Sequence, residues 1–515
     1  MNRILSFGGL AATSTILMTT TALADISASE VWQAWQEDAA RMGMSLTAAN
    51  VTETGNGLDL SPLEFTATIP QFGEMEAPLD LRFNIGGVSL QENGGDVAVV
   101  WPENQEGVIS VTYGQDGGAL SFETTSTART TNISGTTDEM TYDVNLESLA
   151  WKISDWSVTS DELSTADLAK LVFEMSGLMA GAEMQAIVNR ENGWQADFTG
   201  KTATSSYEFL MDSGDSKLNQ RQSQSQSGVN YTSRVTLPDA MDFTTAEGLI
   251  AALKGGLGIA LNGSIDEMEQ TQVQTTPMGE VTSNILAKDQ TFDMQIDSGI
   301  VKVAGVAGET NVNIAGGMIP PVSIGAAGMD IDITAPLIAD NTRARYMVAL
   351  NEFTLNDEIW GMFDPAGMLS RDPAQLTIDL SADPSWQIDV LDLAAWENVG
   401  PDALPLMPND IRLDAFELSA AGASITGTGE MSVNYDPVAK GEQPLPAGHI
   451  DLAASGINGL MDNLTKMGFL PEQQAMGARM MMGLFAVPGE GEDTLQSRLE
   501  INEAGEIRAN GQRLK

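Results

Sequence analysis

Few residues of this chain are of the types that usually carry out chemistry. Its 515 residues include no cysteine and one histidine, His449. This composition excludes disulfides, thiolate catalysis and cysteine-ligated metals, and it nearly excludes imidazole metal sites. No G-x-S-x-G segment offers His449 a nucleophilic serine. We interpret His449 as a surface or capping residue and expect a protein that is not an enzyme, with no catalytic residues and no cofactor.

The acidic residues offer two weaker candidate sites. Asp330 and Asp332 are two positions apart in an alternating segment, so on a strand they share a face, where a calcium ion could bridge them. Solvated aspartates are far commoner on strands, and we expect no metal. Arg371 is close in sequence to Asp364 and Asp372. We favour a structural ion pair with one of them over an arginine–carboxylate clamp for a polar ligand.

The charge balance excludes one class of partner. The chain has 25 basic and 71 acidic residues, a formal charge of -46, and we find no local basic patch. Such a charge repels a phosphate backbone, so we expect no nucleic-acid binding. With 42% hydrophobic and 19% charged residues, the chain has enough apolar material to fold.

The N-terminus has the pattern of a signal peptide over residues 1–24. Arg3 gives a positive start, residues 4–18 are mildly apolar, and Ala22-Leu23-Ala24 matches a cleavage site. The apolar segment is short for an uncleaved membrane anchor, which needs about 20 residues. We therefore expect export to the periplasm, a mature chain that begins at Asp25, and no transmembrane span after cleavage.

Alternating apolar and polar residues dominate the rest of the chain and predict strands with one polar face. Gly-Gly, Asn-Gly and Asp-Gly pairs between them suit hairpins rather than long crossovers. We expect a β-dominated α+β fold with large curved antiparallel sheets, of meander or groove-like form, and a few capping helices. The clearest alternating segments are residues 79–85, 141–146, 301–303, 329–333 and 411–416.

Four places have a helical pattern. Ser27 and Glu30 have capping-box spacing before an amphipathic segment that Gly43 ends. Residues 164–178 and 244–254 predict two further helices, the second with Thr244 and Glu247 as its capping box. Near residues 455–485 the i, i+3, i+4, i+7 spacing predicts a helical hairpin, with Gly468 ending its first helix and Pro471 opening the second.

The chain is long enough for two lobes. We place a division near residue 240, which gives a β-rich lobe with the opening helix at 25–240 and a β-rich lobe with the helical hairpin at 241–515. The polar residues 213–227 suit a linker, a hairpin tip or a polar strand pair equally well. The Gly- and Pro-rich residues 316–328 predict an irregular connection.

Several segments resemble a bacterial envelope family catalogued as domain of unknown function 2125. They are Asp357-Glu358-Ile359-Trp360, Phe363-Asp364-Pro365-Ala366-Gly367 and the following segment from Leu369 to Leu380, together with the opening helix, Val99-Val100-Trp101-Pro102 and the C-terminal hairpin. The resemblance covers essentially the mature chain. It implies an envelope protein of Gram-negative bacteria without an assigned activity, so no catalytic residues are carried over.

Methionine is abundant, with 27 residues, and gathers at the C-terminal hairpin. Thioether side chains fill irregular cores, and they also line adaptable apolar pockets. We expect either a protein that binds or transfers a lipid or another apolar ligand, or a structural or interaction protein that works through its acidic surface. The candidate ligand-groove residues are Leu460, Met461, Leu464, Met467, Met476 and Met481.

Overall fold

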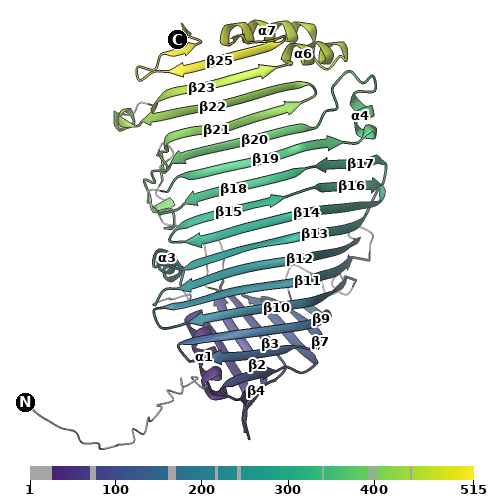
Figure 1. Ribbon diagram of the computed structural model, residues 1–515, viewed down its shortest axis with the longest axis vertical. Helices are drawn as coiled ribbons and strands as arrows, with labels where there is room; N and C mark the ends of the chain where they lie inside the picture. Colours follow the sequence, from purple (N-terminus) through teal and green to yellow (C-terminus); the bar gives the residue numbers. More distant parts are fainter. Residues whose placement is uncertain are drawn as a thin grey trace, which may run out of the picture.

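The computed structural model describes residues 26–69, 77–159, 170–214, 219–239, 245–338, 342–392, 395–396, 399–400, 403–440 and 443–514. The expected signal peptide and its cleavage site lie outside these residues. The described strands form one antiparallel sheet, in which they follow one another along the long axis of the molecule (Figure 1). The expected β-dominated α+β fold is confirmed.

The sheet is a meander, because strands that are neighbours in space are also close along the chain. Five times, two short strands lie end to end along one longer neighbour. For example, β2 pairs with β3 along one half and with β4 along the other. Many loops between paired strands are short, as the glycine-rich punctuation predicted. Longer segments join β12 to β13, β20 to β21 and β23 to β25.

The strands are bounded as follows. The first part contains β1 (Met44–Thr54), β2 (Gly57–Ile69), β3 (Leu79–Ile85), β4 (Val88–Asn93), β5 (Asp96–Val100), β6 (Asn104–Tyr113), β7 (Asp116–Thr127), β8 (Thr130–Gly135) and β9 (Glu139–Thr159). The middle contains β10 (Val172–Asn189), β11 (Trp194–Asp212), β12 (Asn219–Leu237), β13 (Gly258–Thr276), β14 (Gly279–Asp297), β15 (Ile300–Ala307), β16 (Thr310–Gly316), β17 (Ile319–Ala326), β18 (Gly328–Pro336) and β19 (Ala344–Leu355). The last part contains β20 (Ala374–Asp383), β21 (Asn409–Ala420), β22 (Ala423–Asn434), β23 (Leu445–Ser455), β24 (Val487–Pro488), β25 (Thr494–Ile501), β26 (Ile507–Ala509) and β27 (Gln512–Arg513).

The helices lie at the ends and edges of the sheet (Figure 1). They are α1 (Ala28–Arg41), α3 (Ala246–Lys254), α4 (Asp357–Phe363), α6 (Ile457–Lys466) and α7 (Glu472–Phe485), with the short 3-10 helix η1 (Asp436–Lys440). The opening helix, the C-terminal hairpin and all five of the clearest alternating segments are confirmed.

Three local expectations are wrong. Residues 172–178, expected in a helix, lie in β10, where Val172, Met175 and Leu178 are held by pairing with β11; residues 164–169 lie outside the described chain. Residues 319–326, expected to be irregular, form β17, which pairs with β16 despite its two prolines. The cap of α3 is Thr245, whose hydroxyl accepts from the Gly248 N–H; Thr244 is not among the described residues.

The polar segment at 213–227 is a strand over most of its described length. Residues 219–227 belong to β12 and pair with both β11 and β13. The sheet is also continuous across the division that we placed near residue 240, because β12 and β13 pair over most of their length. Two lobes as separate folding units stay a prediction.

An irregular line crosses the sheet at one level of successive strands. At this level the residues that face one another on successive strands are left out of the regular strand pairing. They are Gly181, Ala203, Gly228, Asp266 and Asp289. Gly181, Gly228 and Asp289 have φ of 62°, 63° and 49°. Such left-handed residues bend a strand and interrupt its alternation. We call this line the crease.

A second interruption of this kind, in β2, keeps the apolar residues on one face. In β2 the apolar positions change from Leu58 and Leu60 to Leu63 and Phe65, that is, from even to odd numbers, across such an interruption. All four nevertheless belong to one core cluster or pack against it. The change in alternation is therefore cancelled by the irregular backbone.

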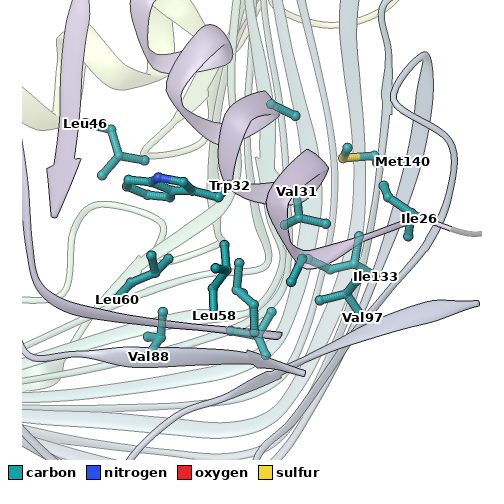
Figure 2. Packing of buried hydrophobic residues seen from close by; sticks show 14 of the residues in the cluster. Ile26, Val31, Trp32, Leu46, Leu58, Leu60, Val88, Val97, Ile133 and Met140 are labelled. Atoms are coloured by element: carbon teal, nitrogen blue, oxygen red, sulfur yellow. The ribbon is translucent and has the colours of Figure 1, made fainter. Parts of the chain in front are cut away.

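The main core forms where the sheet bends around α1 (Figure 2). Ser27 and Glu30 form the expected capping box, so the helix begins before its apolar side reaches the sheet. Figure 2 shows Trp32 pointing between Leu46 and Leu60, and Val31 is fully buried.

A buried ion pair fastens α1 to the middle of the sheet. Asp38 Oδ1 accepts hydrogen bonds from Arg190 Nε at 2.9 Å and Trp194 Nε1 at 2.7 Å, and Asp38 Oδ2 accepts from Arg190 Nη2. Burial lowers the pKa of Arg190, but hydrogen bonding and the charge of Asp38 outweigh it and raise the pKa overall. Arg190 is therefore a cation at neutral pH. We call these three residues the Asp38 lock.

Candidate functional site

One row of residues runs across the sheet in direct register from β9 to β25. Almost all its members are apolar, aromatic or glycine. We call this set the apolar row and the side to which it points the apolar face. The row is Val144, Met184, Gly200, Tyr231, Gly263, Phe292, Gly305, Ile331, Val348, Ile378, Phe416, Gly427, Leu452 and Ser497.

Aromatic rings lie over the glycines of this row. A Cβ added to Gly200 would lie 2.3 Å from the ring of Tyr231, and one added to Gly263 would lie 2.3 Å from the ring of Phe292. Each ring therefore occupies the space that its neighbour's missing side chain leaves. The aromatic and glycine positions together give a continuous apolar surface across β11 to β14.

Towards its N-terminal end the apolar face is covered by helices. There α1 fills the bend, and Ala252 of α3 packs with Val188, Trp194 and Leu237. Further along, large apolar side chains on the same face are exposed, and a soluble protein rarely leaves so many on one surface. They are Ile259, Met294, Ile296, Met329, Ile331, Tyr346, Leu380 and Leu418.

The opposite side, which we call the polar face, carries charged residues and ion pairs. Lys302 Nζ lies 2.6 Å from Asp293, and Arg345 bridges Asp332 at 2.6 Å and Asp379 at 2.8 Å. Asp330 accepts a hydrogen bond from Asn351. The two aspartates considered for calcium thus have protein partners, and the described residues hold no group of three or more metal-ligating side chains.

Two shallow hollows lie on the polar face. One, of about 610 Å³, is lined by residues 143–145, 183–185, 199–201, 230–232 and 262–264; the other, of about 580 Å³, has a similar lining on β21 to β25. On each strand the lining is a row residue with its immediate neighbours, whose side chains point away from the apolar face. These two hollows therefore do not open onto the apolar face.

The C-terminal hairpin divides the six candidate groove residues. Met461 is the buried residue of α6, a helix that contacts β22. Leu460, Leu464 and Met467 are half-buried. Met476 and Met481 of α7 are exposed to solvent at 64% and 52%. The hairpin thus combines a packed inner side with an exposed outer side, to which Phe469, Met480 and Leu484 also belong.

This division predicts unequal effects of truncation. Met461→Ala should lower the free energy of unfolding by about 2 kcal/mol, because it leaves a cavity under α6. Met481→Ala should lower it by less than about 0.5 kcal/mol, because the side chain has few neighbours to lose. Urea denaturation of both variants measures the difference, and equal losses would contradict this placement.

The Arg371 pairing differs from the expectation. Arg371 pairs with Asp357 of α4 and lies 5.8 Å from the ring centroid of Trp360. Asp364 is fully buried and accepts from the N–H groups of Leu369 and Met368, both at 2.9 Å, and these hydrogen bonds lower its pKa. Asp364 is therefore a structural residue of the loop after α4.

His449 lies on β23 of the polar face. Its Nδ1 is 3.8 Å from Glu430 and its Nε2 is 3.5 Å from Asp451.

The apolar row was not foreseen as one surface. Each of its strands shows the alternation that predicts one apolar side, but only the pairing register shows that these sides join.

The comparisons with known proteins give one match. Residues 249–505 match the model of a bacterial family described as an uncharacterized protein conserved in bacteria, domain of unknown function 2125. This confirms the resemblance over the segment that contains α4, its following loop and the C-terminal hairpin; Trp32, Trp35 and residues 99–102 lie outside the match. No curated protein and no solved structure matches the chain. None of the described helices combines the length and apolar composition needed to cross a membrane.

Proposed function

We propose, starting from the match to a bacterial family without known activity, that this chain is a non-enzymatic envelope protein whose apolar face binds the acyl chains of a lipid. The observation that carries the proposal is the apolar row with its exposed neighbours. We further propose that the protein is exported with cleavage after Ala24 and works in the periplasm. The N-terminal sequence pattern supports that location.

The dimensions of the row suit acyl chains. Neighbouring strands lie about 4.8 Å apart, so a row from β9 to β25 extends on the order of 60 Å. A bilayer's hydrocarbon core is about 30 Å thick, and the chains of one leaflet span about half of it. Several acyl chains, end to end or side by side, would fit along the row.

The energetics also suit this ligand class. Each methylene removed from water contributes about 0.8 kcal/mol, so ten methylenes supply about 8 kcal/mol before the cost of immobilising the ligand. The apolar row and the exposed apolar side chains beside it supply the matching surface. The acidic polar face, with a net charge of -46 over the whole chain, keeps such a protein soluble.

Two neighbouring positions test the proposal on opposite faces. Ile331 of β18 lies in the apolar row and is 38% exposed, whereas Val306 of β15 points to the polar face and is 43% exposed. Ile331→Asp should weaken binding of a fluorescent fatty acid by about ten- to a hundredfold, because it removes apolar contact and adds a charge. Val306→Asp should leave binding unchanged.

Fluorescence titration of both variants gives the affinities, and thermal denaturation shows that both are folded. Solvent extraction of the purified wild-type protein, followed by mass spectrometry, should also recover lipid. Equal effects of the two substitutions, or a wild-type protein that takes up no fatty acid, would contradict the proposal. An interaction protein that works through its acidic polar face would then replace it.

A further inference from the structure

Arg129 is a partly buried cation without an acidic partner among the described residues. It lies between β7 and β8, and its Cζ is 3.9 Å from the ring centroid of Trp101. Among the described arginines that are partly buried, Arg129 differs from Arg190, Arg343 and Arg345, which are all paired with aspartate.

Two further polar groups next to Arg129 also have no partner. Trp101 Nε1 and Thr131 Oγ1 are buried and make no hydrogen bond within the described structure. The pairing of Val97 with Ile133 and of Ala98 with Asn132, continued along both strands, places Trp101 opposite Arg129. Thr131 follows two residues after Arg129, so two buried donors without a partner lie beside the partly buried guanidinium.

This cluster lies at the end of the apolar row. Thr131 is directly opposite Val144, the first residue of the row, and Trp101 packs against the core around α1. A buried donor without an acceptor destabilises a fold. Retaining two of them beside a cation without an acidic partner suggests that another molecule provides the acceptor.

We propose that Arg129, Thr131 and Trp101 bind the anionic head of an amphiphile whose acyl chain follows the apolar row. The acyl part rests on the proposed function, whereas the anion site rests on the three unpartnered groups. A carboxylate or phosphate would accept from the guanidinium, the hydroxyl and the indole N–H together. Burial lowers the pKa of Arg129 to about 10, so the arginine is still a cation at neutral pH.

The test compares ligands that share a twelve-carbon chain and differ in the head. Laurate, dodecyl phosphate, dodecyltrimethylammonium and dodecyl maltoside are titrated by calorimetry below their micelle concentrations. The wild-type protein should bind the two anionic ligands at least tenfold more tightly than the cationic and neutral ones. Tighter binding of the phosphate than of laurate would point to a phospholipid rather than a fatty acid as the source of the head.

Three variants complete the test. Arg129→Gln should weaken the anionic ligands by ten- to a hundredfold and leave dodecyl maltoside unchanged, and Arg129→Lys should weaken them less. Arg234→Gln, which removes an exposed arginine paired with Asp197, is the matched control and should change nothing. Thermal denaturation checks folding, and the comparison of heads on the wild-type protein decides the matter if Arg129→Gln does not fold.

The outcomes separate the two proposals. If no twelve-carbon ligand binds, the acyl-binding function fails. If all bind equally whatever the head, or if Arg129→Gln weakens all of them equally, the anion site is wrong while acyl binding stands.

Discussion

Asp38→Ala is expected to lower the free energy of unfolding by about 3–5 kcal/mol, because it leaves the buried Arg190 guanidinium without a counter-charge. The side chain of Arg190 is 8% exposed, so water cannot replace the carboxylate. Trp194 loses its hydrogen-bond acceptor in the same step. Urea denaturation followed by circular dichroism measures the loss.

The controls separate the buried pair from ordinary surface charge. Glu123→Ala removes an exposed partner of Lys152 and should change stability by less than about 1 kcal/mol. The double variant Asp38→Ala, Arg190→Met should regain part of the loss, because no uncompensated charge remains. A loss below about 1 kcal/mol for Asp38→Ala, or no recovery in the double variant, would show that the lock is not an ionic one.

Trp32→Ala should destabilise the protein by about 3–5 kcal/mol, because the indole fills the core between α1 and the bend of the sheet. Trp32 is 9% exposed, and its neighbours come from β1 and β2 as well as from α1. The surrounding strands are held by their hydrogen bonds and cannot close the cavity.

The matched control for Trp32 is Trp396→Ala, at an indole that is 42% exposed. It should cost less than about 1 kcal/mol in the same urea experiment. Similar losses for the two variants would mean that the core around α1 does not set the stability of the fold.

The features that could be predicted from the sequence depend on neighbours along the chain. The capping box of Ser27 and Glu30 and the break between Gly468 and Pro471 are signals within a few residues, and both elements form where they were expected. Val172 and Met175 were assigned to a helix because residues three positions apart share one helical face, whereas in β10 they point to opposite faces of the sheet. Pairing with β11, which decides between the two, involves residues more than thirty positions away.

The candidate site depends on register, which the sequence does not reveal. Gly305 pairs with Phe292 on one side and with Ile331 on the other, and this register places both side chains on one face. Arg371 was expected to pair with Asp364 or Asp372. The turn after α4 draws Asp364 inwards onto backbone N–H groups and leaves Asp357 as the arginine's partner.

The meander also has a consequence for the way this chain acquires its structure. Because many strands pair with the strand just before them, many loop closures are short and the entropy lost at each of them is small. When the chain folds from its N-terminus, α1 and the first strands form a core. Each later strand can then pair with a strand that is already folded. Stability then propagates between nearest neighbours, as in a solenoid, and the last hairpin closes the array.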